Sequence, residues 1–213
     1  MKTDDLIEAL AAGAEPVKPR RLERGLWLAA APAAGLAFLG VWYWLQPRPD
    51  LAEAMAGATF WFKAIYTALL AIAGGWLFAR MGRPGADTAG PRLMLFAVLG
   101  AAFSLAVSEM IFTPAGQKMD VLLGSSWKTC PLNVLFLSAL AAPLLFWQAR
   151  RFAPASPAGA GAAAGFMTGA LAATLYGLHC TESAASFVAV WYTLGIGLAA
   201  GAGAVVGKYV LRW

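Results

Sequence analysis

Long apolar stretches recur along this chain, separated by short polar segments that are rich in proline and charge. Six of them are long enough to cross a hydrocarbon core of about 30 Å as helices of about 20 residues. Proline concentrates between the stretches, where a missing backbone N–H does least harm. The pattern predicts an all-α fold, a polytopic membrane bundle of about six helices. The predicted spans are residues 26–45, 60–79, 93–113, 132–148, 160–178 and 185–206.

Small residues dominate the later stretches. Glycines lie four positions apart at Gly161, Gly165 and Gly169, and again at Gly197 and Gly201. Small side chains let helix backbones approach closely in lipid. We expect this packing to lie within one bundle, in preference to a dedicated dimer face. The oligomeric state does not follow from the pattern.

Composition agrees with a membrane protein and leaves little material for a separate soluble domain. The chain has 213 residues, of which 60% are hydrophobic and 13% charged, and its mean hydropathy is +0.65. The first residues are charged and interrupted by Pro16 and Pro19, so no cleavable signal peptide is expected. We divide the chain into a segment at 1–25 and a six-helix transmembrane bundle at 26–213.

The basic residues indicate the direction of insertion, because Lys and Arg are retained on the cytoplasmic side. With both termini in the cytoplasm, 12 of the 16 basic residues lie inside. The other four are Arg48, Lys63, Lys118 and Lys128. Orientation and anionic headgroups therefore account for the net charge of +5, and no direct nucleic-acid partner is expected. The twelve inside residues are Lys2, Lys18, Arg20, Arg21, Arg24, Arg80, Arg83, Arg92, Arg150, Arg151, Lys208 and Arg212.

The candidate chemistry lies in two outward connections. Cys130 closes the segment SSWKTC before the fourth span, and Cys180 lies between the fifth and sixth spans in YGLHCTESAASF. His179, the one histidine of the chain, and Glu182 flank Cys180. Imidazole, thiolate and carboxylate together suit soft or borderline transition metals. The four residues form a candidate sensing site for a regulatory metal ion, and no other cofactor is expected.

Three interpretations of the cysteines remain open. An outward disulfide could pin the two connections together, because an oxidising compartment permits it. A sensory thiol pair could instead bind a metal or react reversibly with an oxidant. A catalytic thiol–disulfide relay is the third, and the absence of a C-x-x-C motif weighs against it. Adjacent ligands such as His179 and Cys180 rarely bind one ion together, and nothing fixes a tetrahedral site.

Two ionisable residues fall near the outer ends of spans, Lys63 in the second and Glu109 in the third. A charge within a span is costly enough to require a partner. A structural ion pair or hydrogen bond is the simpler expectation. A proton or ion path needs several such groups in line.

The first residues predict a short amphipathic helix. Asp4 or Asp5 can cap it, and Leu6, Ile7 and Leu10 gather on one side at helical spacing. This stripe can lie on the membrane, fold against the bundle or dock into a partner. Because anionic lipid repels its acidic residues, we favour a protein partner.

The segments MKTDDLIEAL, SSWKTCPLNVLFLS and YGLHCTESAASFVAVWYTLGI, with the ending VLRW, resemble the NrsF-like negative regulators of extracytoplasmic-function sigma factors. The resemblance covers the whole chain. It implies a multi-pass anti-sigma factor of the bacterial inner membrane that holds its sigma factor inactive until a metal or envelope stress is sensed. It associates two periplasm-facing cysteines with sensing, which match Cys130 and Cys180. His179, Glu182 and Trp127 are added from proximity alone.

The function expected from the sequence is thus that of a non-enzymatic anti-sigma factor. Sigma binding is assigned to the first segment, through Asp4, Asp5, Leu6, Ile7 and Leu10. Metal or oxidant at the cysteines would release the sigma factor. The rival function is a small membrane transporter or thiol–disulfide oxidoreductase.

Overall fold

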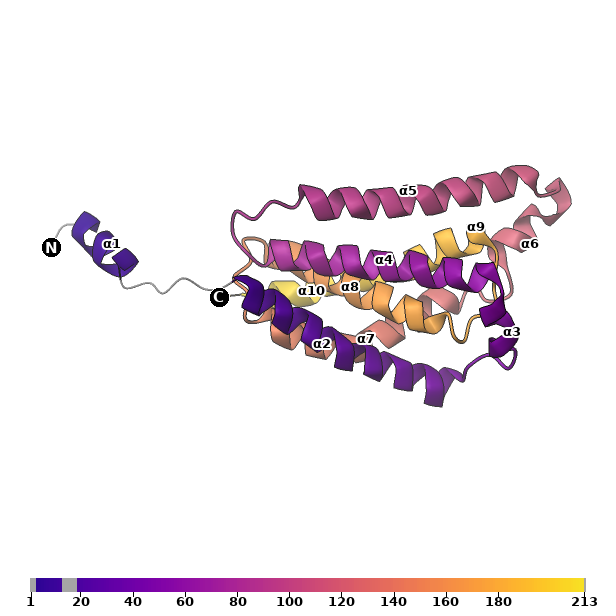
Figure 1. The fold of residues 1–213 in the computed structure, drawn as a ribbon, viewed down its shortest axis with the longest axis horizontal. Helices are drawn as coiled ribbons and strands as arrows, with labels where there is room; N and C mark the ends of the chain where they lie inside the picture. Colours follow the sequence, from indigo (N-terminus) through magenta and orange to yellow (C-terminus); the bar gives the residue numbers. More distant parts are fainter. Residues whose placement is uncertain (1–2, 13–18, 213) are drawn as a thin grey trace.

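The computed structural model describes residues 3–12 and 19–212, and every regular element within these residues is helical. Six helical segments are long and apolar enough to cross a membrane, and they run side by side in one bundle (Figure 1). The predicted all-α architecture of six spans is confirmed. The segments are Glu23–Leu45, Ala58–Met81, Ala89–Phe112, Cys130–Ala149, Pro157–Tyr176 and Ala185–Val210.

The first span combines α2 (Pro19–Gly40) with a π-helical turn at Val41–Leu45, and the last combines α9 (Ala185–Phe187), a second π-helical turn at Val188–Tyr192, and α10 (Thr193–Val210). The other spans are the single helices α4 (Ala58–Met81), α5 (Ala89–Phe112), α7 (Cys130–Ala149) and α8 (Pro157–Tyr176). Outside the spans lie the short helices α1 (Thr3–Ala12), α3 (Leu51–Ala56) and α6 (Lys118–Leu123), with a 3₁₀ turn at Ala115–Gln117 before α6.

The core of the bundle forms around α8. This helix packs against α4, α7 and α10, and more than half of it is buried. In contrast, α5 lies at the edge, against α4 and α9, and exposes large apolar side chains such as Phe96 and Phe112. An apolar outer surface is what helices surrounded by lipid require.

Glycine determines how closely α8 and α10 approach. Gly161 and Gly165 on α8 lie against Gly203 and Gly207 on α10, and a Cβ on Gly207 would lie 2.7 Å from the Gly161 Cα. The predicted close packing through Gly161, Gly165 and Gly169 is confirmed, because α10 covers all three.

The other predicted glycine pair behaves differently. Gly197 and Gly201 face open space, because a Cβ added at either position would have no atom within 4 Å of it. Residues at 197 and 201 lie on a different side of α10 from those at 203 and 207. The glycine spacing indicated correctly that α10 packs closely against a neighbour. The glycines that contact α8 are, however, Gly203 and Gly207.

The two ends of the bundle differ in chemistry. We call one the basic end; it contains the start of α2, the connections 82–88 and 150–156, and the end of α10. There Arg83 forms an ion pair with Glu23, and the Phe152 ring packs beside Gly82. We call the other the cysteine end; it contains the connections 46–57, 113–129 and 177–184.

Candidate functional site

The structure brings the two cysteines together at the cysteine end. Cys130 is the first residue of α7, and Cys180 lies in the connection that follows α8. Both carry free thiols, both are buried, and both belong to one apolar cluster with Tyr176 and Tyr192. Two free thiols separated by 50 positions in the sequence therefore lie in one buried cluster, and we call them the thiol pair.

Local backbone geometry positions each thiol. After α8 ends, the N–H groups of His179 and Cys180 both donate to the Tyr176 carbonyl, at 2.9 and 3.0 Å. This turn folds the chain back, so that Cys180 lies beside the Tyr176 side chain. At α7, the Cys130 N–H donates to the Ser126 carbonyl at 2.8 Å, and Pro131 occupies the first turn, where its missing N–H costs nothing.

The connection 46–57 also holds the Cys180 loop in place. The Arg48 guanidinium forms a two-point pair with Asp50, at 2.7 and 2.6 Å, and its Nη1 reaches the Cys180 carbonyl at 3.4 Å. The hydrogen bonds of this pair raise the pKa of Arg48 and lower the pKa of Asp50. His179 Nδ1 lies 2.7 Å from the Gln46 carbonyl oxygen. The histidine thereby joins the two connections.

A buried lysine holds the loop from beneath. Lys63, on α4, is 2% exposed, and its Nζ donates to the carbonyls of Cys180 and Glu182 at 3.0 and 2.5 Å. The Glu182 carboxylate accepts 2.7 Å bonds from the Ser125 backbone N–H and hydroxyl. Gly124 has φ +55°, and its missing side chain leaves room for that carboxylate. The loop is thus tied to α4 and to the connection before α7.

Glu109 has a structural partner of its own. Its carboxylate oxygens accept hydrogen bonds from the backbone N–H groups of Ala185 and Ser186, at 3.1 and 2.7 Å, and so satisfy the start of α9. Lys63 and Glu109 both make hydrogen bonds within the bundle, as expected from the sequence. They do so with different partners, and not with each other.

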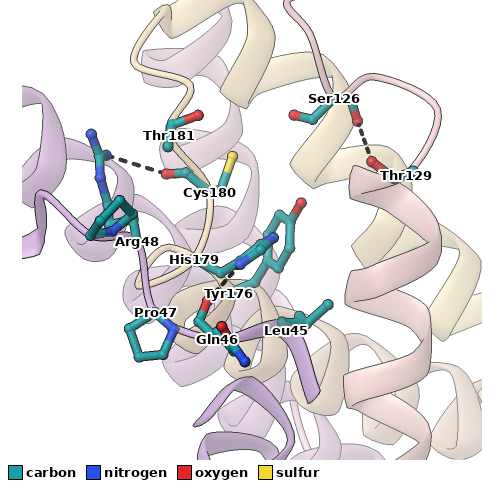
Figure 2. A pocket seen from close by; sticks show the side chains of 11 residues that line it. Leu45, Gln46, Pro47, Arg48, Ser126, Thr129, Tyr176, His179, Cys180 and Thr181 are labelled. Carbon is teal, nitrogen blue, oxygen red and sulfur yellow. Dashed lines mark hydrogen bonds between the residues drawn. The ribbon is translucent and has the colours of Figure 1, made fainter. Parts of the chain in front are cut away.

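A pocket of about 360 Å³ opens beside Cys180. Figure 2 shows the Cys180 sulfur and the Tyr176 hydroxyl pointing towards the wall formed by Ser126 and Thr129. The pocket gives a small reagent a route to Cys180, although the thiol itself is only 3% exposed. The residues lining it are Leu45, Gln46, Pro47, Arg48, Pro49, Ser126, Thr129, Tyr176, His179, Cys180 and Thr181.

The four residues predicted as a metal site do not share one centre in the structure. Cys130 and Cys180 come together, whereas His179 contacts the Gln46 carbonyl and Glu182 binds Ser125. Across residues 3–12 and 19–212, no three His, Cys, Asp or Glu side chains form a group that fits a metal ion. The chemistry that the arrangement offers is that of two thiols, which can form a disulfide or supply two ligands to a soft metal.

Several residues of the site were not identified from sequence. Tyr176 and Tyr192 belong to the same buried cluster as the two thiols. Both tyrosines lie in the motif around Cys180, and their spacing alone gave no sign of this contact. Trp127, added from proximity, packs against Trp191 in a tilted arrangement with ring centroids 5.3 Å apart, at the edge of the same cluster.

The predicted sigma-binding residues lie on α1, whose existence confirms the expected short helix. Asp4 and Asp5 are in its first turn, and both are exposed, as is Ile7. The side chains of Leu6 and Leu10 lie outside the described part of the structure, as do residues 13–18.

Comparison with known proteins places these features in a family. The family model for NrsF, described as negative regulator of sigma F, matches residues 10–213. The chain belongs to the NrsF family. The match includes both cysteine segments and all six spans of the bundle.

Two named relatives align with this chain, and each alignment covers the full length of both proteins. The chain is 42% identical over 219 residues to the anti-sigma-F factor NrsF of Caulobacter vibrioides (strain NA1000 / CB15N). It is 37% identical over 218 residues to the probable anti-sigma-F factor NrsF of Azospira oryzae (strain ATCC BAA-33 / DSM 13638 / PS). No solved structure matches the chain.

Proposed function

We propose that this chain is a membrane anti-sigma factor that holds an extracytoplasmic-function sigma factor inactive and releases it when the Cys130–Cys180 pair changes state. The observation that carries the proposal is full-length similarity to a relative named as an anti-sigma-F factor, at 42% identity. The two free thiols, Cys130 and Cys180, supply groups on which a metal or an oxidant can act. Membership of a regulatory family supports a non-enzymatic role.

The distribution of charge supports an orientation in the bacterial inner membrane. The basic end carries most of the described arginines, including Arg80, Arg83, Arg150 and Arg151, whereas the cysteine end carries few basic groups. The positive-inside rule therefore assigns the basic end to the cytoplasm and the thiol pair to the periplasm. A thiol there meets metals and oxidants before they enter the cell.

Sigma binding is assigned to the cytoplasmic segment 1–25. Asp4, Asp5 and Ile7 of α1 are exposed, and Leu6 and Leu10 complete the apolar stripe in the sequence. A short amphipathic helix of this kind docks into an apolar groove of a partner protein. Acidic residues beside the stripe suit a partner with a basic rim.

Signalling requires two packings of the bundle that differ in their affinity for the inducer. A ligand that binds both packings equally shifts neither. An oxidant that takes two electrons and two protons from the thiols joins Cys130 to Cys180, and a shared soft metal draws both sulfurs to one ion. Either event changes the position of the 177–184 connection relative to α7, and the packing that accommodates the change would be the sigma-releasing one.

A pull-down with the detergent-solubilised protein tests the partner. The full chain should recover a sigma factor from cell extract, whereas a chain lacking residues 1–20 should not. Asp4→Lys with Asp5→Lys tests the same surface without a deletion, and Lys118→Glu, at the cysteine end, is the matched charge-changing control. Recovery of no sigma factor by the full chain would contradict the proposal and favour the transporter or thiol oxidoreductase alternative.

A further inference from the structure

Lys63 stands out because it is a buried ammonium in a membrane-crossing helix. An ionisable group in such a position is costly and needs partners for its protons. Its side chain is 2% exposed, and in the described residues no carboxylate lies within ion-pair distance of it. An apolar side chain of similar length would fill the same space without that cost. The lysine therefore needs an explanation beyond packing.

The partners of Lys63 are two backbone carbonyls of the loop that carries the thiol. Nζ lies 3.0 Å from the Cys180 oxygen and 2.5 Å from the Glu182 oxygen. Hydrogen bonds from a charged donor are shorter and stronger than neutral ones. The ammonium thus fixes two points of the loop, one on each side of Thr181.

The other side chains that hold the thiol loop come from connections. In the described part of the chain, Lys63 is the one side chain of a membrane-crossing helix that hydrogen-bonds the backbone of residues 177–184. Arg48 also reaches the Cys180 carbonyl, but at 3.4 Å and from a connection outside the helices. The Glu182 carboxylate is likewise held by a connection, at Ser125. Through Lys63, α4 gives the loop a rigid anchor.

We propose that Lys63 is the positioning residue of the thiol pair: anchored in α4, it fixes the Cys180 backbone so that the Cys180 sulfur stays buried beside Cys130. The carbonyl that it binds and the sulfur belong to the same residue, so displacement of one moves the other. The position of the Cys130 thiol depends instead on the first turn of α7. The positioning role of Lys63 follows from its hydrogen bonds, and only the use of the thiol pair as a sensor rests on the proposed function.

Alkylation of single thiols tests the inference in the full-length protein in detergent. Cys130→Ser leaves Cys180 as the sole thiol, and Cys180→Ser leaves Cys130. Each form is combined with Lys63→Met, and the rate of reaction with a maleimide is measured. Removing hydrogen bonds from a charged donor should raise local opening, and with it Cys180 alkylation, by about tenfold or more. Cys130 alkylation should change little.

Two further variants keep the result decisive. Lys118→Met removes an exposed lysine from the same end of the molecule and should leave both rates at their wild-type values. Lys63→Arg retains a charged donor and should protect Cys180 better than Lys63→Met does. An unchanged Cys180 rate in Lys63→Met overturns the proposal. Equal acceleration of both thiols also overturns it, because Lys63 would then support the whole bundle.

The assay needs no sigma factor and no inducer. If the pull-down recovers no sigma factor while Lys63→Met selectively exposes Cys180, the proposed function fails and the positioning role stands. If the sigma factor is recovered and Cys180 stays protected, the reverse holds.

Discussion

The carboxylate of Glu182 accepts two 2.7 Å hydrogen bonds from Ser125, one from its backbone N–H and one from its hydroxyl. This contact joins the loop that carries Cys180 to the connection that leads to Cys130. The two thiols are therefore held by a polar frame at the cysteine end as well as by the apolar cluster around them. The hydrogen bonds join the two connections, and the apolar cluster buries most of both cysteine side chains.

The hydrogen bonds from Ser125 to Glu182 predict that Gly124→Ala strongly destabilises the folded protein. Gly124 has φ +55°, a strained conformation for alanine, and a Cβ there would lie 2.5 Å from a Glu182 oxygen. We expect a loss of about 1–3 kcal/mol in the free energy of unfolding. Thermal unfolding in detergent measures it. Gly116→Ala is the control, because its Cβ position is open, and an equal effect of both changes would contradict the role given to Gly124.

The glycine contact between α8 and α10 predicts that two glycine-to-alanine changes on α10 differ in their effect on stability. Gly203→Ala places a methyl group against the α8 backbone at Gly165, whereas Gly201→Ala extends into open space. Overpacking of this kind costs about 1–3 kcal/mol. The unfolding midpoint of Gly203→Ala in denaturing detergent should therefore fall, and that of Gly201→Ala should not. A fall in Gly201→Ala alone would show that its side of α10 packs against a second molecule.

The Arg48–Asp50 pair predicts a dependence on pH. The folded protein lowers the pKa of Asp50 from its ordinary value of 3.8, chiefly through the hydrogen bond from Arg48. Its stabilising contribution is therefore complete above the unfolded-state value and is lost as the pH falls through the lower folded-state value. Asp50→Asn should be less stable than the wild type near neutral pH, and the difference should shrink below pH 3.8. Unfolding curves at several pH values measure it.

The control for this prediction is Glu53→Gln, an exposed carboxylate three residues further along. Its unfolding midpoint should follow that of the wild type at each pH. If the difference between Asp50→Asn and the wild type persisted at the lowest pH, the carboxylate would not be the group responsible.

The orientation predicts which residues an impermeant thiol reagent reaches in intact cells. In a chain whose native cysteines are both serine, Lys128→Cys reports on the cysteine end and Thr3→Cys reports on α1. Lys128→Cys should react in intact cells, and Thr3→Cys only after the membrane is permeabilised. Reaction in the opposite order would invert the topology and place the thiol pair in the cytoplasm.

Much of the fold followed from the sequence because lipid imposes a simple length and polarity rule on each span. The apolar runs gave six spans whose ends differ from those in the structure by a few residues. The rotation of each helix did not follow, since it depends on neighbours: Gly203 and Gly207, and not Gly197 and Gly201, meet α8. The spacing of glycines along a helix does not show which side of that helix packs against a neighbour.

The candidate site followed in part, for a related reason. Topology placed Cys130 and Cys180 at the same end, and the structure brings them together. His179 and Glu182 are neighbours of Cys180 in sequence, but successive residues of a loop point in different directions, and both bind other segments. The partner of Lys63 is separated from it by 117 positions, so no local pattern could indicate it.

Release of a bound sigma factor from the purified complex tests whether Cys130 and Cys180 control sigma binding. The complex in detergent is treated with a thiol oxidant or a soft metal ion, and the sigma factor that remains bound is measured for the wild type, Cys130→Ser and Cys180→Ser. We expect release from the wild type and retention by both serine variants. Release from the serine variants at the wild-type level would contradict this expectation.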